Sequence, residues 1–310
     1  MRIHFIAIGG AIMHSLAIEL KKNGHIISGS DDIIYEPSKS NLMLHKLLPK
    51  KVGWFKRSIH KEIDMVILGM HAKEDNIELL EAKKLKIPIV SFPEYIYKYA
   101  QNKKRIVIAG SHGKTTITSM ILHVLNESNI KIDYLLGAKI NSLDNLVHLQ
   151  NNNAILIEGD EYFSSPIDKQ PKFMYYQPDV LVVSGVSWDH VNVYPTLTSY
   201  HNAFKSIINN VIEKNGQIFY CGDDEFLSKL SIKESNYQPY FLPKYKVKNN
   251  KFYLNNDNVE IPLNIFGQHN LYNLQAAQMV CESLGVSLLN FFKSIQTFNG
   301  ADKRLQLIAE

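Results

Sequence analysis

The residues best suited to chemistry are those at positions 110–116, which read GSHGKTT. They follow a β-branched run, RIVIAG, and precede a run that begins TTITSMIL and is apolar at helical spacing. Glycines in such a turn let backbone N–H groups converge on phosphate oxygens, a lysine adds positive charge, and a following hydroxyl can bind Mg²⁺. The pattern predicts a phosphate-binding loop between a strand and a helix.

The loop is a shortened form of the usual phosphate loop, which has four residues between its first glycine and the Gly-Lys pair. Here only two residues stand between Gly110 and Gly113. We expect Lys114 to face the outer phosphates of a nucleotide and Thr115 to offer its hydroxyl to Mg²⁺. The remaining expected nucleotide contacts come from the rest of the loop, namely Gly110, Ser111, His112, Gly113 and Thr116.

Two further candidates, Glu158 and His190, come after the β-branched runs AILIEG and DVLVVSGV. Ligands of an open α/β sheet bind outside the carboxyl ends of its strands, so both side chains can face a nucleotide. A carboxylate suits Mg²⁺, whereas a histidine is a less usual ligand for it. On the residues alone, a solvated carboxylate and a strand-end histidine are the alternative interpretation.

The N-terminal stretch IHFIAIGGAIMHSLA, with Asp31 about twenty residues further on, is similar to a dinucleotide fingerprint. The fingerprint is incomplete because Ala7 and Ile12 stand where the first and third glycines belong. Close approach of a diphosphate is therefore possible only at Gly9 and Gly10. We expect His14, in the helix that follows, to pack locally.

These candidates must be positioned by an α/β fold. Residues 1–100 alternate short β-branched runs with helical patterns, which predicts a parallel sheet. A polar, basic stretch at 101–105 then precedes a restart of the pattern, and we place a domain boundary there. The strands expected before the boundary cover 3–8, 25–31, 64–70 and 87–92, and the helices cover 11–23 and 75–86.

After the boundary the same alternation continues. Strands are expected at 105–110, 154–159 and 179–186, exposed strands over 244–264, and helices over 270–283 and up to about 297. The predicted domains are 1–102, 103–299 and the start of a further domain at 300–310. A length of 310 residues also favours two domains or slightly more, at about 150 residues per domain.

Composition excludes several classes of protein. With 45% hydrophobic and 21% charged residues, the chain is globular rather than disordered. The 34 basic residues barely exceed the 30 acidic ones, so we expect no nucleic acid and no membrane as partner. Two isolated cysteines and the lack of a signal peptide or membrane anchor favour the cytoplasm.

Taken together, the motifs resemble those of the Mur ligases, ATP-dependent enzymes that build the peptide stem of bacterial cell-wall precursors. The resemblance extends over the whole chain through AIGGAIMHSLA, SGSD, GSHGKTT, EGDEYFSSPIDKQPKFMYYQPDVLVVSGVSWDH, GQHNLYNLQAA and NGADKRLQL. It implies an N-terminal Rossmann-like UDP-binding domain followed by a P-loop ATPase-like central α/β domain. Within the family, DEY followed by DKQPKF is similar to the murein-tripeptide ligases, while the muramate–alanine ligases have a shorter connection there.

The resemblance implies that ATP, with Mg²⁺, activates the carboxylate of UDP-N-acetylmuramate as an acyl phosphate, which an incoming amine then attacks. The expected amine is the tripeptide L-Ala-γ-D-Glu-meso-diaminopimelate. The alternatives are L-alanine as the amine, or a nucleotide-binding scaffold without ligase activity. Lys114 would stabilise the transferring phosphoryl group, and Glu158 and His190 would hold the cations, as the family uses a glutamate and a histidine at these motif positions.

Other roles follow from the same resemblance. Asn270, in a stretch where amide side chains open a helix, would touch the nucleotide, with His269 close by. In several Mur ligases a lysine at the spacing of Lys205 is carbamylated and bridges two Mg²⁺ ions, but the tripeptide and alanine branches generally lack it, which favours a surface lysine here. Arg304 would reach ATP when the domains close, although Gln306 replaces the usual glutamate nearby.

For the first domain, the resemblance favours the UDP part of UDP-N-acetylmuramate over a nicotinamide cofactor. Gly9 and Gly10 would approach the diphosphate. The residues expected near the uridine and sugar are Ser30, Asp31 and Ser38, and His71 is expected near the muramyl group.

The chain ends at Glu310, soon after Arg304. Mur ligases continue with a third α/β domain that holds the incoming amine. We therefore expect these 310 residues alone to bind ATP and UDP-N-acetylmuramate but to form little or no peptide bond.

Overall fold

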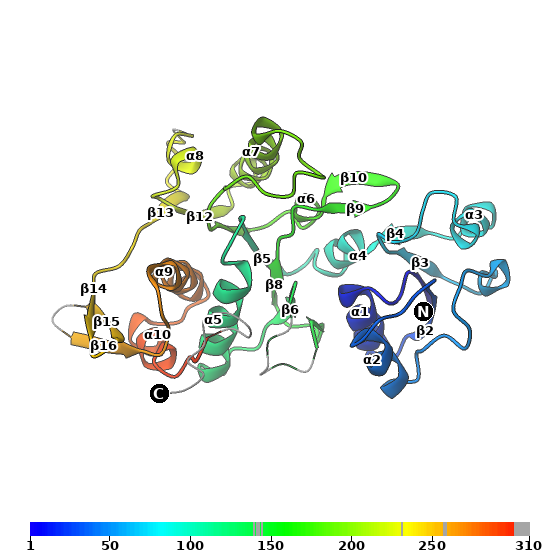
Figure 1. Cartoon of the computed structure of the whole chain (residues 1–310), viewed down its shortest axis with the longest axis horizontal. Coiled ribbons are helices and arrows are strands. Elements are labelled where there is room, and N and C mark those ends of the chain that lie inside the picture. The colour runs from blue at the N-terminus through cyan, green and yellow to red at the C-terminus, as the bar shows by residue number, and fades with distance from the viewer. Residues whose placement is uncertain (139, 141–142, 144, 231, 257–258, 301–310) are drawn as a thin grey trace. The chain divides into compact units, whose positions relative to one another are not determined.

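The computed structural model describes residues 1–300 apart from 139, 141–142, 144, 231 and 257–258 (Figure 1). The chain divides into two compact units, each with its own parallel sheet. The first unit contains residues 1–102, 145–151 and 161–176, and the second contains 103–144, 152–160 and the residues from 177 onwards. The expected contribution of Arg304 lies outside the described residues.

The first unit is built on four parallel strands in the order β2-β1-β3-β4. The central strand β1 pairs with β2 on one side and with β3 on the other. Its side chains Ile3, Phe5 and Ile6 are fully buried, as expected for a strand covered on both faces. The strands are β1 (Arg2–Ile6), β2 (Ile26–Ser30), β3 (Met65–Leu68) and β4 (Ile89–Ser91).

Helices connect these strands, and side chains start two of them. Asn76 Oδ1 accepts hydrogen bonds from the N–H groups of Glu78 and Leu79, and Ser91 Oγ accepts one from Glu94. Such N-caps satisfy backbone donors that the first turn leaves unpaired. The helices are α1 (Ala11–Lys22), α2 (Ser38–Leu44), α3 (Ile77–Lys84) and α4 (Phe92–Tyr99), with a 3₁₀ turn, η1, at Lys56–Ser58.

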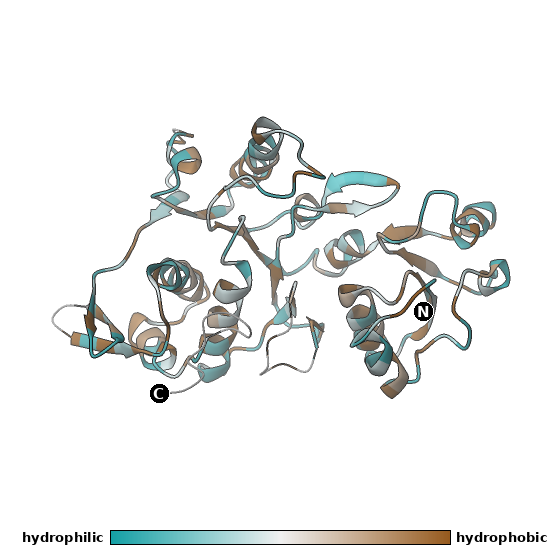
Figure 2. Ribbon diagram, viewed as in Figure 1, coloured by the Kyte–Doolittle hydropathy of each residue, from teal (hydrophilic) through white to brown (hydrophobic). Residues whose placement is uncertain are grey.

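Two segments from later in the chain complete the first unit. One contains the short strand β7 (Val147–His148), which contacts α1. The other contains the hairpin β9 (Phe163–Ser165) and β10 (Asp168–Pro171) and the turn of helix α6 (Lys172–Tyr175), which packs on α4. In Figure 2 β10 is strongly hydrophilic, whereas the strands of the main sheet are hydrophobic.

The second unit contains a larger parallel sheet in which six strands run in the order β13-β12-β11-β5-β8-β6. Strand β5 lies between β11 and β8, so the loop that follows β5 opens at the middle of the sheet's carboxyl edge. The strands are β5 (Lys104–Ala109), β6 (Asp133–Leu135), β8 (Ala154–Glu158), β11 (Val180–Val183), β12 (Gln217–Cys221) and β13 (Tyr237–Tyr240).

Helix α5 follows β5 and packs against α9 and α10, while α7 packs on β11 and β12. A capping box starts α7, because Thr196 Oγ1 accepts from the Ser199 N–H and Ser199 Oγ accepts from the Thr196 N–H. The helices are α5 (Lys114–Glu127), α7 (Leu197–Glu213), α8 (Glu225–Ser228), α9 (Gln268–Ser283) and α10 (Leu288–Ile295).

The exposed strands expected over 244–264 are present as an antiparallel sheet of β14 (Tyr245–Lys248), β15 (Lys251–Asn256) and β16 (Val259–Leu263). No helix among the described residues is long and apolar enough to cross a membrane. The α/β fold class predicted from the sequence is confirmed.

Candidate nucleotide site and its partner site

The predicted phosphate loop lies between the last residue of β5 and the first residue of α5. Gly110 and Gly113 have φ angles of +125° and +82°, a region that favours glycine. A Cβ atom at Gly110 would lie 2.8 Å from the Ser184 nitrogen, and one at Gly113 would overlap the side-chain oxygen of Asn273. Both positions therefore require glycine for conformation and for space.

Residues from the rest of the unit hold this loop in place. Ser111 Oγ donates to the carbonyl of Ser187 at 2.6 Å and lies 3.0 Å from the hydroxyl of Tyr200. Ser184 Oγ donates to the carbonyl of His112. The Lys114 ammonium donates to the Gly110 carbonyl at 2.6 Å, so it is held over the loop.

Glu158, the last residue of β8, lies beside the start of α5. Its Oε2 atom accepts a hydrogen bond from Thr115 Oγ1 at 3.2 Å. Its Oε1 atom is buried and has no hydrogen-bond partner among the described residues. Burial raises the pKa of Glu158 to about 7, against smaller opposing effects from Thr115, the Gly137 backbone N–H and the Lys114 charge.

The donor chemistry at this point fits a divalent cation of the Mg²⁺ type. Such ions prefer oxygen ligands and keep several waters, so they need few protein ligands. The hydroxyl of Thr115 and the unpartnered oxygen of Glu158 supply such ligands. Among the described residues no group of three or more His, Cys, Asp or Glu side chains is arranged to hold a metal by itself.

His190 lies in the loop after β11 in a left-handed conformation, with φ of +57°. Its backbone N–H donates to Asp189 Oδ1 at 2.7 Å, and its side chain is 22% exposed. It is thus accessible, and its ligation of a cation stays a prediction. The Lys205 ammonium lies 5.8 Å from the centre of the Phe226 ring, a cation–π contact that suits a surface lysine.

A cavity of about 290 Å³ adjoins the phosphate loop. The residues that line it are Ser111, His112, Ser184, Gly185, Ser187, Cys221, Asp223, Asp224 and Tyr272. Asp224 stiffens this wall, because Oδ2 accepts from the Val186 N–H at 2.8 Å while Oδ1 caps α8. The cavity gives room beside the loop for the rest of a nucleotide.

The start of α9 borders the same loop through Asn273. Asn273 Nδ2 donates to Asn270 Oδ1 at 3.2 Å, and Asn270 Nδ2 donates to the Phe266 carbonyl at 2.8 Å. Both asparagines are buried, whereas His269 is exposed. Asn273 therefore packs beside Gly113, while Asn270 ties the start of α9 to Phe266, and contact of Asn270 or His269 with a nucleotide stays a prediction.

Four of the predicted residues of the first unit, Gly9, Gly10, Ser30 and Asp31, lie at the carboxyl ends of β1 and β2, whereas Ser38 begins α2 and His71 follows β3. Asp31 Oδ2 accepts a hydrogen bond from the Gly9 N–H at 2.7 Å, and the aspartate is only 2% exposed. Burial raises the pKa of Asp31, with the Gly9 hydrogen bond acting in the opposite direction. Ser30 and Ser38 are buried as well, and His71 is exposed.

Sequence reasoning missed Ser184, Ser187 and Tyr200, which support the phosphate loop, and Asp224, which supports the neighbouring segment at Val186. The first two belong to the polar end of DVLVVSGVS, and strand ends at this edge are a usable signal for ligand sites. Tyr200 and Asp224 carry no local signal, because their partners come from distant segments.

A parallel sheet with a glycine-rich loop after its central strand, a lysine over that loop and a buried carboxylate beside it defines a P-loop nucleotide-binding protein. The comparisons with known proteins narrow this class. The Mur ligase family catalytic domain matches residues 2–104, and the Mur ligase middle domain matches residues 108–281. The chain belongs to the Mur ligase family, whose members are ATP-dependent amide-bond ligases.

Curated relatives come from two branches of the family. UDP-N-acetylmuramate–L-alanine ligase of Carboxydothermus hydrogenoformans is 28% identical over 324 residues, covering 100% of this chain and 68% of the relative. UDP-N-acetylmuramate–L-alanyl-γ-D-glutamyl-meso-2,6-diaminoheptandioate ligase of Haemophilus influenzae is 26% identical over 324 residues, covering 99% of this chain and 70% of the relative.

Among solved structures, the tripeptide ligase of Neisseria meningitides gives a TM-score of 0.84 at 23% identity, covering 96% of this chain and 98% of that chain. The UDP-N-acetylmuramate–alanine ligase of Thermotoga maritima gives a TM-score of 0.76 at 25% identity, covering 100% of this chain and 71% of that chain. The family resemblance inferred from the motifs is confirmed, and both branches remain compatible with the chain.

Proposed function

We propose that this protein uses ATP to join L-Ala-γ-D-Glu-meso-diaminopimelate to the muramyl carboxylate of UDP-N-acetylmuramate. The family membership already makes it an ATP-dependent ligase of peptidoglycan precursors. The observation that carries the site assignment is the buried Glu158 carboxylate, which contacts Thr115 at the start of the phosphate-loop helix.

In this proposal the loop from Gly110 to Thr116 holds the phosphates of ATP through backbone N–H groups and the start of α5. Lys114 compensates negative charge on the phosphoryl group as it moves to the muramyl carboxylate. The amine then attacks the acyl phosphate and displaces inorganic phosphate. The protein contributes mainly orientation and a preorganised electrostatic field.

Mg²⁺ is the cation we expect to accompany ATP, and Thr115, Glu158 and His190 are the residues proposed to hold it. When bound, it would compensate the charge of the phosphate oxygens. Ionised Glu158 is unfavourable in the protein alone because of burial, and Lys114 favours the charged form. The glutamate side chain is therefore suited to a positively charged ligand.

The choice of the tripeptide as amine is supported by the segment from Glu161 to Tyr176. It forms the β9–β10 hairpin and α6, and Asp168 fixes the hairpin by accepting from Ser164 Oγ at 2.9 Å and from the Tyr175 hydroxyl. The alanine branch has a shorter connection here by the sequence resemblance. L-Alanine remains the second candidate, because relatives named as alanine ligases align with the whole chain.

The first unit is proposed to hold the UDP part of UDP-N-acetylmuramate near Gly9 and Gly10, with Ser30, Asp31 and Ser38 around it and His71 towards the muramyl group. Asp31 supports UDP over NAD, because both of its oxygens already accept backbone hydrogen bonds, from the Gly9 N–H at 2.7 Å and from the Asp32 N–H at 2.9 Å. A dinucleotide fold uses such an acid for the ribose hydroxyl. With ATP and a UDP-sugar as substrates, we place the reaction in the cytoplasm.

The amine can be identified by competition. The protein is incubated with ATP, Mg²⁺, UDP-N-acetylmuramate and an equimolar mixture of L-alanine and the tripeptide, and mass spectrometry detects products even when turnover is slow. We expect the tripeptide adduct to predominate. Predominance of the alanine adduct would assign the protein to the other branch.

A further inference from the structure

His14 lies in the first turn of α1, four residues after Gly10. Its side chain is polar yet only 4% exposed, so its ring nitrogens must be satisfied within the protein. The sequence predicts only local packing for this residue. Instead, the side chain links the start of α1 to a second helix, α2.

The contacts of the ring define its protonation. His14 Nδ1 lies 2.9 Å from the Gly10 carbonyl, which can only accept, so Nδ1 carries the proton. His14 Nε2 lies 3.2 Å from Asn41 Nδ2, which can only donate, so Nε2 accepts. The Ser38 hydroxyl lies 3.0 Å from the same Nδ1 atom, so its oxygen shares the single Nδ1 proton with the Gly10 carbonyl. The neutral tautomer with its proton on Nδ1 is compatible with these contacts. Burial lowers the pKa of His14, which also favours the neutral ring.

This histidine adds a side-chain link to the second residue of the turn, whose carbonyl also accepts the His14 backbone N–H at 2.9 Å. Gly10 is the N-cap of α1, and no side-chain hydrogen bond caps this helix. Asp31 fixes Gly9 from one side through its 2.7 Å hydrogen bond. His14 fixes Gly10 from the other side and ties it to Ser38, so the two glycines are held between β2 and α2.

We propose that His14 is a positioning residue for the UDP-sugar site, which keeps the Gly9–Gly10 turn and α2 in their binding arrangement before the ligand arrives. This inference rests on the proposed function of the first unit. A turn that is already ordered loses less entropy on binding, so removal of the link should weaken binding of the UDP-sugar. Binding of ATP in the second unit should not change.

The test measures binding of UDP-N-acetylmuramate and, separately, of a non-hydrolysable ATP analogue by calorimetry. His14→Leu removes both nitrogens at similar volume, and we expect the UDP-sugar Kd to rise about tenfold, which corresponds to about 1.4 kcal/mol or one buried hydrogen bond. His14→Asn retains a donor near Gly10 and should recover part of the loss. Asn41→Ala should give a smaller rise in the same direction, with the analogue Kd unchanged throughout.

Leu20→Ala is the matched control, because Leu20 is a buried residue at the other end of α1. It should lower the melting temperature without raising the UDP-sugar Kd. Unchanged UDP-sugar binding in His14→Leu, or an equal loss in Leu20→Ala, would overturn the inference. If His14→Leu does not fold, the UDP-sugar Kd values of His14→Asn and Asn41→Ala provide the same test. Failure of the wild-type protein to bind UDP-N-acetylmuramate would instead contradict the proposed function of this unit.

Discussion

At the scale of single residues, the fold controls the ionisation of Glu158 by burying it. Its folded pKa of about 7 exceeds the ordinary value of 4.5. Below pH 4.5 the carboxyl group is protonated in both folded and unfolded protein. As pH rises from 4.5 to about 7, the unfolded chain releases its proton first, so the free energy of unfolding falls. Above about pH 7 the free energy of unfolding does not fall further from this group.

We therefore predict that Glu158→Gln, which stays neutral, removes this pH-dependent loss in metal-free protein. Chemical denaturation, with a chelator present, measures the free energy of unfolding at about pH 4.5 and about pH 8. From the lower to the higher pH, this free energy should fall by on the order of 3 kcal/mol more in the wild type than in the variant. Glu234→Gln, at an exposed position, serves as the control and should follow the wild type. Parallel pH profiles of wild type and Glu158→Gln would contradict the raised pKa.

At the scale of elements, the three helices next to the proposed ligand sites begin alike. Their N-cap residues are Gly10, Gly113 and Gly267, and none makes a side-chain cap hydrogen bond. Five other helices in the described part of the chain, including α3 and α7, begin with a side-chain cap. Helix starts without side-chain caps leave backbone N–H groups available to anionic ligands.

This arrangement predicts different outcomes for two glycines with similar backbone conformations. Gly113 and Gly285 have φ angles of +82° and +87°, but only at Gly113 would a Cβ meet a neighbour, the Asn273 amide. Gly285→Ala should lower the free energy of unfolding by about 1–2 kcal/mol through backbone strain and keep ATP-analogue affinity. Gly113→Ala should lower the free energy of unfolding by more than this and should reduce the affinity for the ATP analogue at least tenfold.

Urea denaturation gives the stability of both glycine variants, and calorimetry gives the affinity. Because the two substitutions share the left-handed backbone penalty, their difference isolates the effect of the crowded loop. Equal analogue affinity in Gly113→Ala and Gly285→Ala would show that the contact with Asn273 does not shape the nucleotide site.

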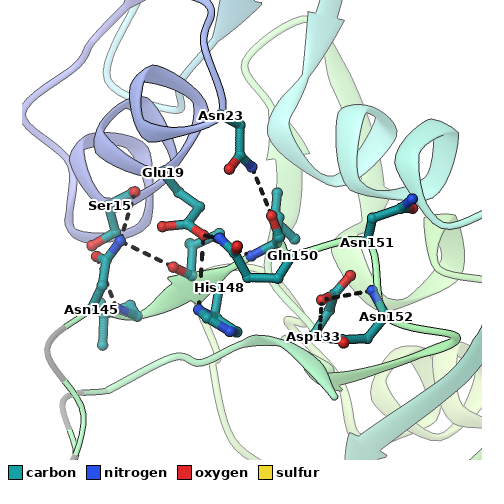
Figure 3. A network of polar contacts seen from close by, with 12 residues as sticks. Ser15, Glu19, Asn23, Asp133, Asn145, His148, Gln150, Asn151 and Asn152 are labelled. Carbon is teal, nitrogen blue, oxygen red and sulfur yellow. Dashed lines mark hydrogen bonds and ion pairs between the residues drawn. The ribbon is translucent and has the colours of Figure 1, made fainter. Parts of the chain in front are cut away.

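At the scale of the whole molecule, the first unit depends on segments that are distant in the chain. Glu19 of α1 is 2% exposed and accepts hydrogen bonds from the Leu149 N–H and from Gln150 Nε2, both at 2.9 Å (Figure 3). Asn145 Nδ2 donates to the Ser15 carbonyl at 3.1 Å, and Asn23 Nδ2 donates to the Leu149 carbonyl at 2.7 Å. The segment 145–151 thus satisfies a buried carboxylate of α1.

We predict that a fragment of residues 1–102 lacks a cooperative thermal unfolding transition. In that fragment Glu19 would lose the donors from 149 and 150, and α4 would lose its packing against α6. Circular dichroism of the fragment and of the full chain makes the comparison. A sharp transition of the fragment at the temperature of the full chain would show that the segments 145–151 and 161–176 are dispensable.

The same contacts can be tested in the intact chain. Glu19→Ala leaves two donors without their acceptor and should lower the free energy of unfolding by about 1–3 kcal/mol. Glu234→Ala removes an exposed carboxylate and should change the free energy of unfolding by less than about 0.5 kcal/mol. A similar effect of the two substitutions would mean that solvent replaces the protein partners of Glu19.

By itself, the sequence determined the α/β class, the phosphate loop and its helix, the family, and the exposed strands near 244–264. These depend on the spacing of residues close in the chain, because hydrophobic periodicity and turn chemistry act between neighbours. Only the tertiary structure decided which polar groups meet. Thr115 and Glu158 are 43 residues apart, and Leu149 and Glu19 are 130 apart. Such pairs form where strands and helices pack, so no local pattern predicts the unpartnered oxygen of Glu158 or the link that His14 makes to α2.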